Sequence, residues 1–266
     1  MKIKHFVITR FLCSNFRGIS DCELLNNKNL ELHYNLLNAH LLKSLEAQTT
    51  TDFELIILIH ENLNIYNKQM FDNVYELKSS FPIKVMFLSE LKNYIYNFYN
   101  TYDFIITSRI DLDDFIAHNA IEKLHNYCKC VDNFCLYGFA DGCTLYYNET
   151  KKENEIYYMP QRYKDVGFLA ILMSLIINTK SIKTPYTIFD MGDHTKCISN
   201  IKNNPSVIGL NKTPAYQFWH YEYFAKDKEY TYLYYMHRNS DSVKAGRTIT
   251  RFSEQSINNN IISQFI

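Results

Sequence analysis

Three carboxylates lie close together in the sequence, at Asp111, Asp113 and Asp114. Side chains this near repel one another, and an ordinary turn needs only one Asp to accept backbone N–H groups. A divalent cation offsets such repulsion, because Mg²⁺ and Mn²⁺ prefer oxygen ligands and commonly join protein carboxylates to substrate phosphates. The pattern therefore indicates a metal-held diphosphate. The alternative is a solvated turn in which Asp113 or Asp114 caps a following helix.

The chain before and around these carboxylates alternates strand-like runs with helical patterns. Strand-like runs of apolar and β-branched residues are Lys2–Thr9, Phe53–Ile59, Ile83–Leu88 and Asp103–Ser108. Helical patterns are the stripes Leu30, Tyr34, Leu37, Leu41, Leu45 and Ile65, Met70, Val74, Leu77, and the segments Leu91–Tyr99 and Ala117–Cys128. This alternation predicts a parallel α/β sheet, in which ligands bind at the carboxyl ends of the strands. The acidic segment follows the fourth strand and is expected at that edge.

The pattern changes after Phe134 to short strand-like pieces, with a charged connection at Glu149–Glu155. These pieces predict antiparallel or mixed pairing. We expect one helix near Asp193–Ile201, then an aromatic, irregular segment. A polar tail follows Thr250.

Composition excludes several classes of protein. The 266 residues are 47% hydrophobic, with 22 Tyr and 18 Phe, which excludes intrinsic disorder. Because 28 basic residues balance 28 acidic ones, no net positive charge attracts nucleic acid. The longest apolar stretch, Val166–Ile177, is shorter than the roughly 20 residues of a membrane span. Arg10 interrupts the short apolar run near the N-terminus, so no signal peptide is expected.

The seven cysteines also favour a reducing compartment. Their number is odd and no Cys-x-x-Cys pair occurs, which disfavours both a disulfide framework and a zinc ribbon. A structural zinc at Cys128, Cys130, Cys135 and Cys143 is the less favoured reading of their clustering. We therefore expect a cytoplasmic protein.

Three segments together resemble a known family. Thr9–Phe11, Ser44–Glu54 and Ser108–Asp114 are similar, in order and spacing, to the rhamnosyltransferase family of bacterial polysaccharide loci. The resemblance covers roughly residues 1 to 130 and implies the glycosyltransferase A fold. That fold is a single α/β domain with a mixed sheet whose N-terminal half is parallel. It implies a nucleotide-sugar-binding half at residues 1–133 and an acceptor-binding half at residues 134–266.

The resemblance also implies roles for the acidic segment. Asp111 is expected on the ribose or diphosphate side, and Asp113 and Asp114 at the metal, with Asp111 as a further ligand. Such folds often complete the metal shell with a histidine near the C-terminus. His237 is the first candidate, with Arg238 and Lys244 near the phosphates, and His220 is a weaker one.

Other residues would hold the donor. Thr9, Arg10 and Phe11 match the place where such folds receive the base and ribose, although Phe11 fits the core equally well. Arg109 either contacts the diphosphate or pairs with a carboxylate. Asp52 is expected only to shape the entry to the second strand.

An inverting transferase of this fold also needs a base. In Asp190-Met-Gly-Asp193-His194 a glycine permits a tight turn before the expected helix. Asp193 is the first candidate and Asp190 the second, while His194 either assists or packs. The alternative is that Asp193 only caps the helix. Trp219 and its aromatic neighbours fit either a sugar-stacking surface or the core.

Together these features predict a metal-dependent, inverting glycosyltransferase with Mn²⁺ or Mg²⁺ as cofactor. It would move rhamnose or another hexose or deoxyhexose from a nucleotide sugar to a glycan or lipid-linked glycan of bacterial capsule or lipopolysaccharide. Peripheral contact with the inner membrane is left open. The enzymatic alternative is a nucleotidyltransferase, although Phe11–Gly18 contains one glycine and not a glycine-rich loop. The non-enzymatic alternative is a carbohydrate-binding module.

Overall fold

The computed structural model describes residues 1–13, 20–148, 153–160, 167, 171–212, 214–222, 232–236 and 256–257. Its first half alternates strands and helices, as predicted. In chain order these are β1 (Ile3–Phe11), α1 (Asp21–Leu24), α2 (Asn27–Leu36), a π-helical turn (Leu37–Leu42), α3 (Lys43–Glu46), β2 (Glu54–Ile59), α4 (Leu63–Tyr66), α5 (Lys68–Tyr75), β3 (Ile83–Phe87), α6 (Leu91–Tyr96), β4 (Phe104–Arg109), β5 (Asp114–Ile116) and α7 (Ala120–Tyr127). Short 3₁₀ turns lie at Leu88–Glu90 and Cys128–Cys130.

The second half is mainly β-structure. Its elements are β6 (Phe134–Phe139), β7 (Asp141–Asn148), β8 (Glu153–Pro160), β9 (Met173–Asn178), a 3₁₀ turn (Ile188–Met191), α8 (Cys197–Asn203), a 3₁₀ turn (Pro205–Ile208), β10 (Trp219–Glu222), β11 (Tyr232–Met236) and β12 (Ser256–Ile257). All seven cysteines are free thiols. Within the described part of the chain, no helix is long and apolar enough to cross a membrane.

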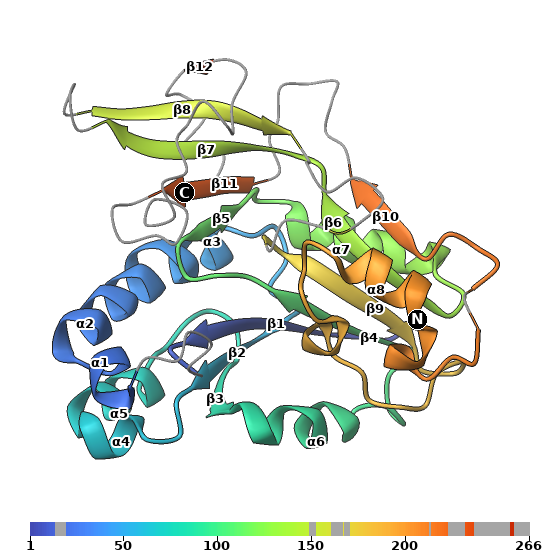
Figure 1. Cartoon of the computed structure of the whole chain (residues 1–266), viewed down its shortest axis with the longest axis horizontal. Helices are drawn as coiled ribbons and strands as arrows, with labels where there is room; N and C mark the ends of the chain where they lie inside the picture. The colour runs from blue at the N-terminus through green and yellow to red at the C-terminus, as the bar shows by residue number, and fades with distance from the viewer. Residues whose placement is uncertain are drawn as a thin grey trace.

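A seven-stranded sheet in the order β10-β6-β9-β4-β1-β2-β3 forms the centre of the molecule, and a five-stranded sheet, β12-β8-β7-β11-β5, lies beside it (Figure 1). Strand β1 pairs in parallel with β2 and β4, and β2 pairs in parallel with β3. Strand β9 runs antiparallel between β4 and β6. The predicted single α/β domain, a mixed sheet with a parallel N-terminal half, is confirmed.

Helices cover both faces of the seven-stranded sheet. Alternate residues of β1 face opposite layers: Val7 and Phe11 pack with α2 and α7, whereas Phe6 and Ile8 pack with α6 and α8. Strand β2 is buried along its whole length, as the uninterrupted apolar run predicts for a strand covered on both sides. These two apolar layers hold the strand ends in place, so the side chains at those ends have fixed positions.

The alternative in which Asp113 or Asp114 caps a helix does not hold, and the helix expected near Asp193 begins later than predicted. The chain after Asp113 does not enter a helix: it forms β5, in which Asp114 pairs with β11, and α7 begins only at Ala120. Helix α8 begins at Cys197, and its N-cap is Lys196 rather than Asp193. In the first case pairing with a distant strand extends the chain. In the second, the Asp193 carboxylate accepts hydrogen bonds from Thr195 within a turn.

The apolar stripe predicted after β2 also differs in part. Met70 and Val74 are buried on α5, but Ile65 lies on the separate short helix α4 and is 80% exposed. The pattern combined two helices into one, because Asn67 ends α4 and caps α5. The stripe from Leu30 to Leu45 is correct, and its four leucines are fully buried.

Candidate active site

The ends of β1 and β4 bring Arg10, Arg109 and Asp111 together. The two strands are parallel neighbours, with Ile8 opposite Arg109, so residues shortly beyond that register meet at one edge of the sheet. Arg10 lies on the α6 and α8 face, as Ile8 does, because side chains alternate along a strand, and Thr9 therefore lies on the other face. The family resemblance had assigned Arg10, Arg109 and Asp111 to one donor site.

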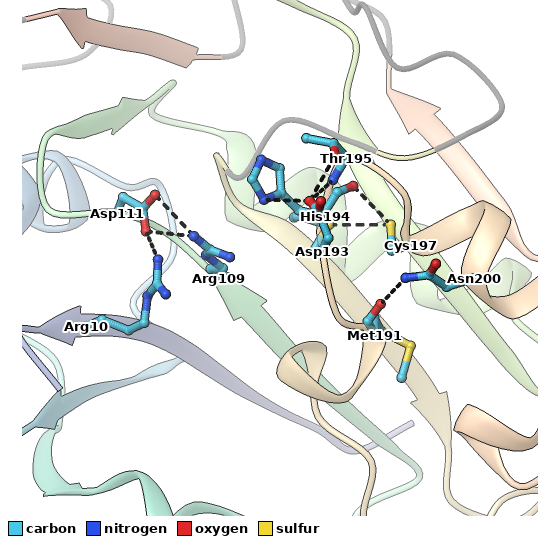
Figure 2. Close-up of polar contacts among 10 residues, drawn as sticks. Arg10, Arg109, Asp111, Met191, Asp193, His194, Thr195, Cys197 and Asn200 are labelled. Atoms are coloured by element: carbon cyan, nitrogen blue, oxygen red, sulfur yellow. Dashed lines mark hydrogen bonds and ion pairs between the residues drawn. The ribbon is translucent and has the colours of Figure 1, made fainter. Parts of the chain in front are cut away.

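Asp111 is held between two arginines (Figure 2). Its Oδ1 lies 3.3 Å from Arg10 Nη2, and Arg109 Nη2 donates to both Asp111 oxygens at 3.4 Å. Burial opposes ionisation of this carboxyl, but the charges of Arg109 and Arg10 outweigh burial and hold its pKa below the ordinary value. Both alternatives considered for Arg109 remain compatible, because it pairs with a carboxylate at an edge where a diphosphate is expected.

Asp114 is in the opposite electrostatic situation. Its side chain is buried, and its Oδ1 has no hydrogen-bond partner among the described residues. Burial and the charges of Asp113 and Asp111 together raise the pKa of the Asp114 carboxyl well above its ordinary value. A buried carboxyl with an unused oxygen and two acidic neighbours has the donor chemistry of a hard divalent cation site.

The acidic segment by itself does not complete a metal site. Among the described residues, no three His, Cys, Asp or Glu side chains are gathered so that they could hold a metal ion. His237, Arg238 and Lys244 lie outside the described residues. Asp113 and Asp114 therefore fit a cation by donor type, and any further ligand comes from elsewhere in the chain, the substrate or solvent.

Thr9 and Phe11 lie on the same face of β1, because side chains alternate along a strand. Thr9 is fully buried, and its Oγ1 has no hydrogen-bond partner among the described residues. Phe11 is also fully buried, but its ring lies edge-on to His33 in the apolar layer beneath α2. Phe11 is thus a core residue, which is the second of the two alternatives given for it. Thr9 keeps a buried hydroxyl oxygen without a partner among the described residues.

The segment Ser44–Glu54 positions the acidic loop, a role that the sequence did not reveal. Ser44 Oγ accepts a hydrogen bond from the backbone N–H of Ile116 at 2.9 Å. Gln48 Nε2 donates to the carbonyl of Ala117 at 3.0 Å, and the N–H of Thr49 donates to His118. These bonds fix the strand that begins at Asp114. The sequence signal for this contact was that Ser44–Glu54 and Ser108–Asp114 both carry motifs of the same family.

Asp190 is an anchor for its own loop. Its Oδ2 accepts from the N–H of Thr187 at 2.8 Å and from the Thr187 hydroxyl at 3.1 Å. Its Oδ1 lies 2.5 Å from Lys92 Nζ on α6. The N–H of Ile188 donates to Thr107 on β4. With both oxygens engaged in fixing the turn, Asp190 has a structural function in this arrangement.

Asp193 and His194 lie on the loop between Met191 and α8, on the face that also carries Arg109. Asp193 Oδ1 accepts from the Thr195 N–H at 2.9 Å and the Thr195 hydroxyl at 2.8 Å. His194 Nδ1 lies 3.8 Å from the same oxygen. Figure 2 shows the His194 ring directed toward the side on which Arg109 and Asp111 lie.

The remaining candidates belong to the framework. His220 stacks on Tyr127 with ring centroids 4.1 Å apart, and its Nε2 lies 3.2 Å from Glu222 Oε2. Trp219 is partly buried beside Phe218, and Lys202 Nζ lies 4.2 Å from a Trp219 ring centroid. Asp52 lies before β2, at the opposite edge of the sheet from Asp111. These positions favour the packing alternatives for His220 and Trp219.

Comparisons with known proteins give no family assignment. No family model matches the chain, and no curated protein matches it. Similar solved structures include mouse xyloside xylosyltransferase 1, with 9% identity, a TM-score of 0.34, and coverage of 74% of this chain and 75% of that one. Another is a protein described as a nucleotide-diphospho-sugar transferase from Desulfovibrio desulfuricans G20, with 9% identity, a TM-score of 0.38, and coverage of 83% and 80%.

A third structure is described as a glucose-1-phosphate thymidylyltransferase from Bacillus anthracis in complex with sucrose. It shares 12% identity with a TM-score of 0.39, covering 98% of this chain and 99% of that one. TM-scores this low do not separate glycosyl transfer from nucleotidyl transfer. The function is therefore argued from the residues at the sheet edge.

Proposed function

We propose that this protein is a glycosyltransferase that binds a nucleotide-sugar donor at the carboxyl ends of β1 and β4. The observation that carries the proposal is the cluster of Arg10, Arg109 and Asp111 at these strand ends. Two buried atoms on or next to this cluster, Arg109 Nε and Asp114 Oδ1, have no hydrogen-bond partner among the described residues. Native proteins satisfy nearly all buried polar groups, so such exceptions beside a charged cluster indicate a place completed by a ligand. The arginines supply the positive charge that a diphosphate needs.

Each residue then has a definite task. Arg109 and Arg10 would hold the diphosphate, and Asp111 would keep both guanidinium groups in position. Asp113 and Asp114, with Asp111 and His237 as further candidates, would hold Mn²⁺ or Mg²⁺. When bound, such an ion neutralises charge that develops on the leaving diphosphate. Thr9, on the opposite face of β1 from Arg10, is the remaining candidate that the resemblance assigns to the base and ribose.

The finer assignment rests on the resemblance of three motifs. It proposes transfer of rhamnose or a related sugar, with inversion, to a glycan or lipid-linked glycan of a bacterial surface polysaccharide. This reaction takes place in the cytoplasm, where nucleotide sugars are made, at or near the inner membrane. The ordered spacing of Thr9–Phe11, Ser44–Glu54 and Ser108–Asp114 supports it. Side chains of the second motif also form hydrogen bonds with the backbone of Ile116 and Ala117, just after the third motif.

A substrate panel tests the proposal. The full chain is incubated with UDP-, dTDP- and GDP-sugars, Mn²⁺ and a set of methyl glycosides, and release of nucleoside diphosphate is followed. We expect release with at least one donor, and its loss in excess EDTA and in Asp114→Ala. Activity that persists in EDTA would reject the metal. Release of pyrophosphate from a nucleoside triphosphate and a sugar 1-phosphate would instead identify a nucleotidyltransferase.

Binding measurements distinguish a glycosyltransferase from a carbohydrate-binding module. Calorimetry with the same nucleotide sugars and Mn²⁺ should show donor binding that weakens at least about tenfold in Arg109→Ala, as expected when a charge-assisted contact is lost. Glycan binding with no nucleotide-sugar binding would support the carbohydrate-binding module. Lys180→Ala is a matched control, because Lys180 is an exposed cation that pairs with Asp103 at the opposite edge of β4.

A further inference from the structure

The loop that carries His194 is fixed against its surroundings. Gly167 lies so close to the backbone of His194 and Thr195 that a Cβ atom there would collide with both. The Cys197 thiol contacts the His194 carbonyl at 3.3 Å. Asn200 Nδ2 donates to the Met191 carbonyl (Figure 2). The backbone that carries His194 is therefore held in place on both sides of this residue.

Asp193, the base expected from the sequence, is poorly suited to accept a proton. It is 53% exposed, and its Oδ1 already accepts two hydrogen bonds from Thr195. Its limited burial favours a raised pKa, but the Thr195 hydrogen bonds and the charge of His194 outweigh burial and lower the pKa of this carboxyl. A carboxylate stabilised in this way is a weaker base than an ordinary one.

His194 has the properties that Asp193 lacks. Its side chain is 27% exposed, and Nδ1 faces the Asp193 carboxylate. No described residue forms a hydrogen bond to Nε2, which leaves this atom available to a substrate. Burial and the charge of Arg109 lower the pKa of the imidazole, although Asp111 and Asp193 act in the other direction. The lowered pKa favours the neutral ring, and with Nδ1 on the side of Asp193 the nitrogen left for a substrate proton is Nε2.

We infer that His194 is the catalytic residue that accepts the acceptor's proton and that Asp193 is the positioning residue that orients its ring. This inference rests on the proposed function. The acceptor hydroxyl oxygen forms a bond to the anomeric carbon of the donor sugar, on the face opposite the leaving group. The bond from that carbon to the diphosphate oxygen breaks, and its electron pair leaves with the nucleoside diphosphate. The hydroxyl proton moves to His194 Nε2.

The test uses the donor and methyl glycoside that give the fastest nucleoside diphosphate release in the panel. We expect His194→Ala to lower kcat at least about a hundredfold, the usual contribution of a general base, with the donor Kd changed less than about twofold. Added imidazole should restore at least about a tenth of the lost rate, because it can occupy the cavity and accept the proton. Asp193→Asn should lower kcat less, by about tenfold.

Matched variants make the result decisive. His60→Ala is the control: His60 Nε2 lies 3.5 Å from Asp21, so it is another histidine beside an aspartate, and its loss should neither slow transfer nor confer a response to imidazole. Unchanged turnover in His194→Ala, a rate loss that imidazole does not restore, or a product of retained configuration would overturn the inference. A larger loss in Asp193→Asn than in His194→Ala would return the role to Asp193. Absence of donor binding in the wild-type protein would instead reject the proposed function.

Discussion

Buried polar side chains on β1, on β4 and at the start of β5 fall into two groups that differ in how completely they are hydrogen-bonded. Within the sheet, His5 Nε2 lies 2.7 Å from Ser108 Oγ, which lies 2.6 Å from Ser174 Oγ, and the latter donates to a carbonyl. At the strand ends, buried atoms of Thr9, Arg109 and Asp114 have no partner among the described residues. Thr9 is only four residues beyond His5 on the same strand.

On the other face of the sheet, a second buried polar cluster is also hydrogen-bonded. Lys4 Nζ lies 2.6 Å from Glu54 Oε2, and the Tyr94 hydroxyl donates to Glu54 Oε1 at 2.6 Å. The Lys4 ammonium also lies 5.1 Å from the Phe98 ring centroid. Completed polar clusters serve the fold, whereas incomplete ones at an edge cost stability in the free protein and can be kept for a ligand.

The largest effect on folding is expected from breaking a completed pair. Glu54→Ala leaves Lys4 and the Tyr94 hydroxyl without their partner in a largely buried site. We expect the free energy of unfolding, measured by urea denaturation, to fall by about 3 kcal/mol. Asp72→Ala removes the exposed Lys68–Asp72 pair and should change it by less than about 0.5 kcal/mol. Equal losses in the two variants would contradict the distinction between buried and exposed pairs.

A smaller loss is expected inside the hydrogen-bonded cluster. Ser108→Ala removes the hydroxyl that joins His5 and Ser174 while changing little volume. Because His5 Nε2 is then buried without that partner, the free energy of unfolding should fall by about 2 kcal/mol. Nucleoside diphosphate release measured below the unfolding transition should be retained. Unchanged stability would show that the cluster contributes nothing to the fold.

The substitution Asp114→Asn, in contrast, should raise the free energy of unfolding. Burial and the charges of Asp113 and Asp111 raise the folded-state pKa of Asp114, so the folded protein keeps a proton that the unfolded chain releases above pH of about 3.9. The wild-type protein therefore loses stability from this group as pH rises from about 4 to 7. At pH 7 and without metal, the variant should be more stable by about 1 kcal/mol.

The gain in unfolding free energy from Asp114→Asn should shrink as the pH falls toward 4. At that pH the wild-type carboxyl is increasingly protonated in the unfolded chain as well as in the folded one. Urea denaturation at several pH values measures this, and Asp111→Asn is the contrasting variant. Asp111 has a lowered pKa and two arginine partners, so its neutralisation should destabilise the protein at pH 7. If Asp114→Asn were destabilising at neutral pH without metal, the Asp114 carboxylate would have to form stabilising contacts in the folded protein.

The smallest effect on stability is expected from Thr9→Val. The two side chains have the same shape, and the hydroxyl that is lost has no partner among the described residues. The free energy of unfolding should stay constant or rise by up to about 1 kcal/mol, while donor affinity, measured by calorimetry, should fall. A clear loss of stability would place Thr9 with the completed clusters. A stable variant with unaltered donor affinity would remove it from the site.

Much of the fold could be predicted because its signals are local. The apolar run of β2 and the leucine stripe on the helix that follows β1 depend on residue spacing within one element. The helix start near Asp193, and the alternative in which Asp113 or Asp114 caps a helix, both failed for a shared reason. An acidic residue after a strand fits a cap, a turn or a strand start equally well, and only distant partners decide between them.

The candidate site could be predicted in part for the same reason. Parallel strands place Arg10, Arg109 and Asp111 at one edge, and the family resemblance had assigned them to one donor site. The sequence could not show that Phe11 lies in the core, because a strand has two faces and its last residue can serve either. Nor could it show that Asp190 pairs with Lys92 on α6, a helix nearly a hundred residues earlier.

The sequence by itself determined the α/β class, the parallel N-terminal half and the strand edge at which chemistry is expected. These follow from periodicity and chain order, which act over a few residues at a time. Only the tertiary structure decided which carboxylates are satisfied: two guanidinium groups hold Asp111 ionised, whereas burial beside like charges raises the pKa of Asp114. The physical reason is that burial and partner charges depend on the whole packed chain, and the identity of a residue does not encode its surroundings.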